Sequence, residues 1–303
     1  MDGDTLGSAL ALSMALTKMN KKAEVIYEER IPQSLSVLSG DGFLKEFSVY
    51  SEDIDRDWGI VVVVDTADPM MLGKRKHILP HASCVVNIDH HFTNKNYGDQ
   101  ILIEDSFAAT AEIIFFLIKE MQVEIDYDIA ICLYTGICTD TGGFKYGNTT
   151  GQSHQIAAEL LQFNLDIAAL HYLFFDAMSQ KKLNCISFIS TSITFHYQGR
   201  LAIAVIPHAN YEELDASDED YEGLVDLGRN VQGTEVSILA REIRENEFRL
   251  NLRSKGKTDV SIMAKNNNGG GHRAASGCTI SVKSKNIKEF IVNEMKYAFT
   301  ASL

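Results

Sequence analysis

The stretch Cys84-Val-Val-Asn-Ile-Asp-His-His91 carries the strongest clue to the fold of this 303-residue chain. Its apolar run predicts a strand buried on both faces, and the run ends directly in an acidic residue and two histidines. A second run of the same kind, Ile60-Val-Val-Val-Val64, also ends in an acidic residue, Asp65. Near-continuous apolar strands are typical of a parallel sheet covered by helices on both sides. We therefore predict an α/β fold.

Helical segments are predicted on either side of these strands. Apolar residues recur at helical spacing over 5–19, 110–121, 126–134 and 151–163, and a short strand is expected at 23–27. After a further helical segment at 165–182, the pattern changes to strands, expected at 190–196, 201–206, 235–241, 247–252 and 277–282. We place a domain boundary near residue 180. A parallel-sheet domain is expected at 1–180 and a smaller α/β domain at 181–303.

The composition argues against several classes of protein. The chain has 28 Lys and Arg against 41 Asp and Glu, a formal net charge of −13, so it is not expected to bind long nucleic acid. Its five cysteines are scattered without a Cys-x-x-Cys pair, which suits the reducing cytoplasm. No apolar run reaches the roughly 18 to 20 residues that span a bilayer. A cytoplasmic globular protein without a membrane partner is expected.

Acidic residues and histidines gather at four places in the first half: Asp2 with Asp4, Asp65, Asp89-His90-His91, and Asp140 in a predicted glycine-rich turn at 136–144. Singly, each is explained by a helix cap or a turn. At the carboxyl ends of parallel strands, however, such residues meet in one crevice, where ligands of open α/β sheets bind. Carboxylates with imidazole suit Mn²⁺ or Mg²⁺, and two such ions about 3.5 to 4 Å apart activate water for phosphoester cleavage.

A glycine-rich stretch, Asn268-Gly-Gly-Gly-His-Arg-Ala-Ala-Ser-Gly277, dominates the second half and is preceded by Leu252-Arg-Ser254. Consecutive glycines let backbone N–H groups approach an anion closely. His272 and Arg253 would supply positive charge beside them. Alone, such a stretch is also compatible with a simple hairpin.

Together these motifs resemble the DHH phosphoesterase superfamily. The resemblance rests on Asp89-His-His91 after an apolar strand, with Asp-Gly-Asp, Val-Asp-Thr-Ala-Asp and Thr-Asp-Thr-Gly-Gly-Phe around it. The glycine-rich stretch is similar to the substrate-binding domain that accompanies DHH domains in nanoRNases and pAp phosphatases. The resemblance therefore implies a DHH domain followed by a DHH-associated domain, with the active site in the cleft between them.

The resemblance also implies roles for the residues that match the metal motifs. Asp2 would bind one metal ion, Asp4 would bind the other, and Asp65 would bridge the two. His90 and Asp140 would complete the shell of the second ion. Two divalent ions are therefore expected, with Mn²⁺ as the expected metal and Mg²⁺ or Co²⁺ as alternatives.

The substrate would be held by residues from both halves. His91 would face the scissile phosphate, and Asp89 would orient its neighbours from behind the ligands. In the second half, the matching residues expected to bind substrate are Arg253, Ser254, Gly269, Gly270, Gly271 and His272.

Two departures from the family pattern stand out. The family's first motif reads His-x-x-Pro-Asp-x-Asp, but Met1 stands at the Pro position and the motif His and the strand before it are absent. We interpret this start as a cut through the motif and expect unpaired backbone groups in the sheet. Asn268 replaces the first glycine of the usual Gly-Gly-Gly-Gly-His. Because Asn tolerates left-handed backbone, we expect that loop to be retained.

The implied function is hydrolysis of short oligoribonucleotides to mononucleotides, with release of phosphate from 3′-phosphoadenosine 5′-phosphate as a second activity. A phosphodiesterase for linear or cyclic dinucleotides is an alternative, because the same cleft would hold either. A nucleotide-binding protein of weak or no activity is another, since one metal would lack its histidine. A RecJ-type exonuclease and a DHH-type inorganic pyrophosphatase fit less well. A homodimer remains an open alternative for the assembly.

Overall fold

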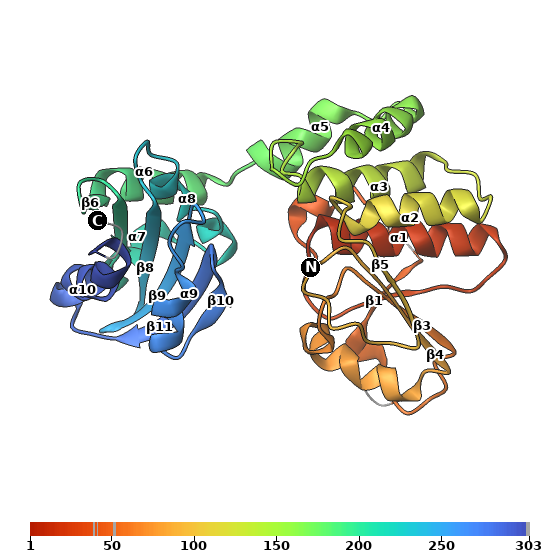
Figure 1. Cartoon of the computed structure of the whole chain (residues 1–303), viewed down its shortest axis with the longest axis horizontal. Coiled ribbons are helices and arrows are strands. Elements are labelled where there is room, and N and C mark those ends of the chain that lie inside the picture. Colours follow the sequence, from red (N-terminus) through yellow and green to blue (C-terminus); the bar gives the residue numbers. More distant parts are fainter. Residues whose placement is uncertain (39, 41, 51–52, 301–303) are drawn as a thin grey trace. The chain divides into compact units, whose positions relative to one another are not determined.

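The computed structural model describes residues 1–38, 40, 42–50 and 53–300. The chain divides into two compact units, Met1–Ala177 and Met178–Leu303, and each has its own buried apolar core (Figure 1). The predicted α/β class is confirmed in both units. No helix among the described residues is long and apolar enough to cross a membrane.

The first unit contains a three-stranded parallel sheet in the order β3 (Ile60–Val64), β4 (Cys84–Asp89) and β5 (Gln100–Ile103). A separate parallel pair is formed by β1 (Val25–Tyr27) and β2 (Leu44–Glu46). Within the described residues, β1 and β3 therefore each have a strand partner on one edge only.

Both faces of the three-stranded sheet are covered. One face packs on helices α1 (Gly3–Lys18), α2 (Thr110–Glu120) and α3 (Tyr127–Asp140), which lie side by side in Figure 1. The other face packs on the 3₁₀ segment η3 (Pro69–His81), with Val63 and Leu72 in a small separate cluster. This double burial explains why the strands read as unbroken apolar runs. The unit ends with α4 (Gly151–Leu160) and α5 (Ile167–His171).

Helices α1 and α3 approach each other closely through glycines. A Cβ on Gly7 would lie 2.3 Å from the carbonyl oxygen of Cys132, and a Cβ on Gly136 would lie 2.8 Å from Oδ1 of Asp4. Both distances are far below a van der Waals contact, so only glycine permits this helix separation. The close approach brings the start of α1 next to the end of α3, where Asp140 is the last residue.

The second unit is built on a six-stranded sheet in the order β10, β11, β9, β8, β7, β6. Strands β7 and β8 are parallel, and the other pairs are antiparallel. The strand bounds are β6 (Thr194–His196), β7 (Leu201–Ile206), β8 (Val236–Arg244), β9 (Glu247–Ser254), β10 (Gly270–His272) and β11 (Ala275–Ser281).

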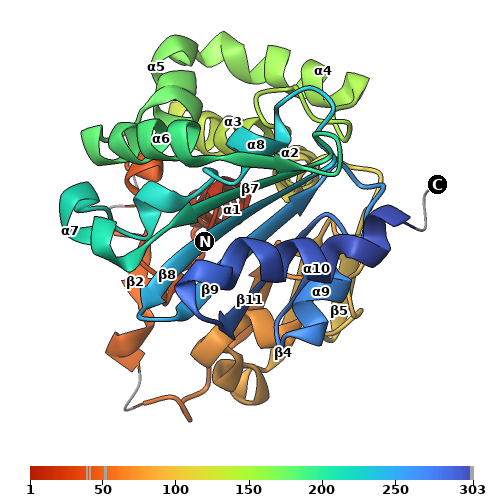
Figure 2. The ribbon, with the colours of Figure 1, turned by 90° about the vertical axis from the view of Figure 1, so that its left-hand side faces the viewer.

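Helices cover both faces of this second sheet (Figure 2). One core joins the strands to α9 (Ser261–Asn266) and α10 (Ile287–Thr300). The other joins them to α6 (Gln180–Ser192) and to a segment that contains α7 (Tyr211–Leu214) and precedes α8 (Asp226–Arg229). The remaining short helical turns are Gln33–Leu35, Phe47–Tyr50, Leu161–Phe163, Tyr172–Asp176, His208–Asn210, Glu219–Tyr221 and Ser284–Asn286.

Three predicted boundaries were wrong. The helix expected at 126–134 continues to Asp140, so Gly136 lies inside a helix and the glycine turn begins only at Thr141. Gly136 misled the prediction because it serves the close helix contact rather than a turn. The strand expected at 190–196 is helical up to Ser192, where Ser190 donates its hydroxyl to the carbonyl of Ile186. The helix expected at 165–182 is interrupted at 177–179.

We predict that Gly7→Ala destabilises the protein by about 1 to 3 kcal/mol, despite the better helix propensity of Ala, because the new Cβ overlaps the backbone of α3. Urea unfolding measures the change. Gly147→Ala is the matched control, since a Cβ there meets nothing within 4 Å. Equal stability of the two variants would refute the role of glycine in this helix contact.

Candidate metal centre

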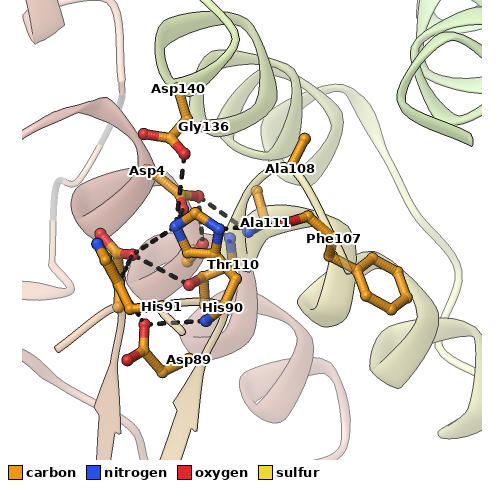
Figure 3. Close-up of polar contacts among 12 residues, drawn as sticks. Asp4, Asp89, His90, His91, Phe107, Ala108, Thr110, Ala111, Gly136 and Asp140 are labelled. Carbon is orange, nitrogen blue, oxygen red and sulfur yellow. Dashed lines mark hydrogen bonds and ion pairs between the residues drawn. The ribbon is translucent and has the colours of Figure 1, made fainter. Parts of the chain in front are cut away.

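The side chains of Asp4, His90 and Asp140 converge at one end of the parallel sheet (Figure 3). Nε2 of His90 lies 3.4 Å from Oδ2 of Asp140, 3.6 Å from Oδ1 of Asp65 and 4.0 Å from Oδ2 of Asp4. Among the described residues, two groups each place their ligand atoms within 4.8 Å of one another. They are Asp4, His90 and Asp140, and Asp65, His90 and His91. His90 belongs to both groups and links them.

Two of the four predicted clusters follow strands, and two do not. Asp65 comes directly after β3 with a left-handed backbone (φ 54°), and Asp89 is the last residue of β4. Asp140 instead lies at the carboxyl end of helix α3, and Asp4 lies in the first turn of α1. The expectation that Asp140 sits at the centre of a turn was therefore wrong. A carboxylate at the carboxyl end of a helix interacts unfavourably with the helix dipole. A nearby cation offsets this repulsion.

Asp2 caps helix α1 and also contributes to the charge of the site. Its Oδ1 accepts hydrogen bonds from the backbone N (2.9 Å) and the hydroxyl (2.8 Å) of Thr5. The same hydroxyl lies 2.6 Å from Oδ2 of Asp65. One hydroxyl hydrogen cannot serve two carboxylates at once. The pair of acids therefore has fewer donors than it needs, which a bound cation would remedy.

Asp4 is fully enclosed and holds the start of helix α2. Its Oδ2 accepts from the backbone N of Thr110 (2.6 Å), and its Oδ1 accepts from the backbone N of Ala111 (2.9 Å) and the hydroxyl of Ser8 (3.1 Å). The N-cap residue of α2, Ala109, has no capping side chain. Asp4 thus supplies, from a distant part of the chain, the cap that the local sequence lacks.

The segment before α2 also orients His90. Nδ1 of His90 donates to the carbonyl oxygen of Phe107 (3.3 Å), which directs Nε2 toward the carboxylates. Oε2 of the buried Glu112 accepts from the backbone N of Ala108 (3.2 Å), and the hydroxyl of Thr110 donates to Oδ1 of Asp65 (3.1 Å).

The contacts by which residues 107–112 hold Asp4, Asp65 and His90 in place were not predicted from the sequence. Two signals were available: the N-cap position of α2 is Ala109, which has no capping side chain, and an acid, Glu112, stands directly before the apolar run 113–118. Both point to partners elsewhere in the chain.

The acids of the site resist ionisation. Burial, with the charges of Asp65 and Asp140, raises the pKa of Asp4 well above its usual value. Burial, with the charge of Asp2, raises the pKa of Asp65 to about 6 despite the Thr5 hydroxyl. Burial also raises the pKa of Asp140, against the opposing effect of His90. A cluster of carboxylates with raised pKa values gains most from a divalent cation that replaces the missing protons.

Asp89 lies behind His91 and fixes its orientation. Its Oδ1 accepts from Nδ1 of His91 (2.7 Å) and the backbone N of His90 (2.9 Å), and its Oδ2 accepts from Nδ2 of Asn94 (2.6 Å). Burial pushes the pKa of Asp89 upward, but these hydrogen bonds outweigh it and keep the pKa below the usual value. The bond to Asp89 raises the pKa of His91 to about 9. His91 is therefore an imidazolium at neutral pH, with 42% of its side chain exposed.

In the second unit, strand pairing brings Arg253 and His272 to the same end of the sheet. Ala275 of β11 pairs with His272 on one side and Arg253 on the other, so all three residues face the same side. Ser254, the next residue of β9, faces the opposite, buried side, and its hydroxyl accepts from the backbone N of Gly256 (3.2 Å). The structure therefore does not bring Ser254 together with Arg253.

The glycine-rich stretch leads into β10 and needs its glycines. A Cβ on Gly269 would lie 2.2 Å from the carbonyl oxygen of Gly277, and one on Gly271 would lie 2.5 Å from Cα of Ser276. Gly270 is exposed, and a Cβ on this residue would meet nothing within 4 Å. Asn268 adopts the expected left-handed backbone (φ 56°), so the replacement of the first glycine is accommodated.

The residues of the first unit fit divalent metal ions. The carboxylates of Asp4, Asp65 and Asp140 and the imidazole of His90 form a hard donor set. The hydroxyl of Thr5 can donate to only one of the two carboxylates beside it, Asp2 or Asp65. The orientation of His90 by Phe107 is the arrangement typical of a histidine that binds a metal.

Comparisons with known proteins agree with this geometry. Residues 1–137 match the N-terminal domain of the DHH family, and residues 198–300 match the DHHA1 domain. The bifunctional oligoribonuclease and PAP phosphatase NrnA of Thermus thermophilus is 34% identical over 282 residues, which are 92% of this chain and 81% of that protein. The protein of the same name from Bacillus subtilis is 27% identical over 286 residues, 92% of this chain and 86% of that one.

The fold has a near counterpart among solved structures. An exopolyphosphatase-related protein of Bacteroides fragilis superposes with a TM-score of 0.89, 24% identity and coverage of 98% of this chain and 90% of that one. The resemblance inferred from the sequence motifs is confirmed. The chain belongs to the DHH phosphoesterase superfamily, in the NrnA-like group that combines a DHH with a DHHA1 domain, and it is a metal-dependent hydrolase of phosphoester bonds.

Proposed function

We propose that the protein hydrolyses very short oligoribonucleotides to mononucleotides and removes the 3′-phosphate of 3′-phosphoadenosine 5′-phosphate. The observation that carries this proposal is the carboxylate and imidazole cluster of buried Asp4 and Asp65 with the partly buried His90 and Asp140, in a chain whose relatives include oligoribonucleases. The formal net charge of −13 supports a short substrate, because a long phosphate backbone would be repelled.

In this proposal, residues 1–180 carry the hydrolytic centre and two divalent ions, with Mn²⁺ as the proposed metal and Mg²⁺ or Co²⁺ as alternatives. Asp2, Asp4, Asp65, His90 and Asp140 would hold them, with Asp65 between the two. When bound, such ions neutralise phosphate charge and lower the pKa of water so that it becomes a nucleophile at neutral pH.

The protein's own groups position and neutralise the substrate. His91, charged and partly exposed, faces a phosphate oxygen and stabilises the charge that develops there, while Asp89 keeps the ring in place. Residues 181–303 bind the substrate, with Arg253, His272 and the backbone of Gly269, Gly270 and Gly271 around its anionic groups.

The alternative of a phosphodiesterase for linear or cyclic dinucleotides uses the same residues and differs only in preferred substrate. Turnover of a dinucleotide, a cyclic dinucleotide and 3′-phosphoadenosine 5′-phosphate under identical conditions separates them. A further alternative is a nucleotide-binding protein of weak activity. It predicts nucleotide binding without turnover.

The full chain with Mn²⁺ should release mononucleotides from a diribonucleotide, and Asp65→Asn should lower kcat at least about 100-fold because it removes a shared carboxylate. Chromatography of the products measures both. Asp128→Asn, at an exposed position in the first turn of α3, is the control and should retain activity. Absence of mononucleotide with Mn²⁺, Mg²⁺ and Co²⁺ would reject the proposed function.

Acidification should stabilise the metal-free protein. The pKa of Asp65 is raised from 3.8 to about 6 in the folded state, so between these values the folded protein binds more protons than the unfolded chain. Stability therefore rises as pH falls through this window. Asp65→Asn should be more stable than wild type at pH 7 and less dependent on pH. Urea unfolding with a chelator present measures this, and identical pH profiles would contradict it.

At pH 7, Mn²⁺ at 100 times its Kd should add about 2.7 kcal/mol to the free energy of unfolding.

Asp89→Asn should shift the alkaline limit of activity to lower pH. The variant loses the carboxylate that raises the pKa of His91 to about 9, so the ring should return toward its ordinary value of 6.5. At pH 8 roughly one ring in 30 would then carry a proton. The deficit in kcat relative to wild type should therefore be larger at pH 8 than at pH 6. NMR titration of His91 checks the pKa directly, and a deficit independent of pH would contradict the interpretation.

A further inference from the structure

Phe92 directly follows the two histidines of the metal motif and is 87% exposed. Its neighbour His91 is partly exposed, and the imidazole of His91 lies 4.5 Å from that of His90, measured between ring centroids. A large aromatic side chain is therefore held in solvent one residue from the group that faces the scissile phosphate. When a ligand covers such a phenylalanine, a large apolar surface is removed from water, which favours binding.

The loop that carries Phe92 is firmly anchored, so its exposure is not the result of a loose segment. Nδ2 of Asn94 donates to Oδ2 of Asp89 (2.6 Å) and to Oδ1 of the buried Asn87 (2.9 Å). The backbone N of Lys95 donates to the carbonyl oxygen of Ala67 (2.9 Å). Phe92 is held between these anchors and the end of β4. A side chain that is already held in place loses little conformational entropy when a ligand covers it.

The loop that follows β3 leads directly into η3, whose first turn adds two more exposed apolar residues. Met70 is 65% and Met71 is 60% exposed. This loop is joined to that of Phe92 by the Lys95 to Ala67 hydrogen bond and by an ion pair of 2.5 Å between Lys95 Nζ and Oδ2 of Asp68. We call Met70, Met71 and Phe92 the apolar lip. Methionine adapts its shape to flat ligands and makes favourable contacts with aromatic rings.

We propose that the apolar lip is a nucleobase-binding subsite in which the base of the substrate stacks on Phe92. This inference rests on the proposed function and extends it to the recognition of the base. A nucleobase is joined to its phosphate by one ribose, and Phe92 is the residue next to His91, which is proposed to face the phosphate. Stacking on an aromatic ring accepts every base, because every base has a flat π face.

The charge of the protein strengthens this argument. With a formal net charge of −13, long-range electrostatics oppose the approach of a nucleotide, so affinity must come from local contacts. Stacking of a base on an aromatic ring needs no positive charge. The subsite therefore supplies affinity that the acidic surface does not, and purines, with their larger faces, should gain more than pyrimidines.

The test compares AMP with ribose 5-phosphate, which carries the same phosphate without a base. Equilibrium binding of each to the full chain with Mn²⁺ is measured for wild type, Phe92→Ala and Phe92→Trp. We expect wild type and Phe92→Trp to prefer AMP by roughly tenfold, and Phe92→Ala to lose that preference while its Kd for ribose 5-phosphate is unchanged. With a diribonucleotide as substrate, Phe92→Ala should raise KM by a similar factor and leave kcat within about twofold.

Tyr127→Ala is the matched control. Tyr127 is 47% exposed and is the first residue of α3, whose last residue is Asp140, so it lies about 20 Å from the metal centre. This variant should behave as wild type. An unchanged preference for AMP in Phe92→Ala would overturn the proposal, as would a change of oligomeric state in that variant with unchanged KM. Because the binding assay needs no turnover, it tests the subsite even if no phosphoester is cleaved.

Discussion

The first unit is organised around the repulsion between carboxylates that are enclosed at one end of a parallel sheet. Asp4 and Asp65 are buried, and Asp140 has a raised pKa close to them. The hydroxyl of Thr5 lies between Asp2 and Asp65 and can donate to only one of them at a time. Such an arrangement costs stability in a metal-free protein and yields a high affinity for hard cations.

The surrounding packing keeps these acids from moving apart. Gly7 allows helix α1 to pack closely on the backbone of α3, and Gly136 leaves room for the carboxylate of Asp4. Asp4 in turn replaces the missing cap of helix α2, so the start of α2 depends on a buried acid of α1. The same residue therefore serves the fold and the site. Removal of its side chain would leave the start of α2 uncapped and would also remove one of the proposed metal ligands.

The sequence was sufficient for the parts of the fold that follow simple periodicity. The apolar runs before Asp65 and Asp89 predicted two buried parallel strands correctly. The sequence was insufficient where the role of a residue depends on a contact that its sequence neighbours do not indicate. Gly136 was assigned to a turn because the helix that it contacts, α1, is more than a hundred residues away in the chain. Ser254 was grouped with Arg253 because the motif is contiguous, although alternation along a strand sends adjacent side chains to opposite faces.

The two loops at the carboxyl ends of β3 and β4 separate two tasks that a nucleotide imposes. In the proposed function the phosphate requires positive charge, which the imidazolium of His91 and the divalent ions held by the carboxylate cluster would supply. The base requires a flat apolar surface, and Phe92 provides one on the adjacent residue without adding charge. Because both groups sit on a loop fixed by Asn94 and Asp89, their spacing is set before the substrate arrives. An acidic protein can in this way bind an acidic ligand, since the attraction is local and the repulsion is spread over the whole surface and screened by salt.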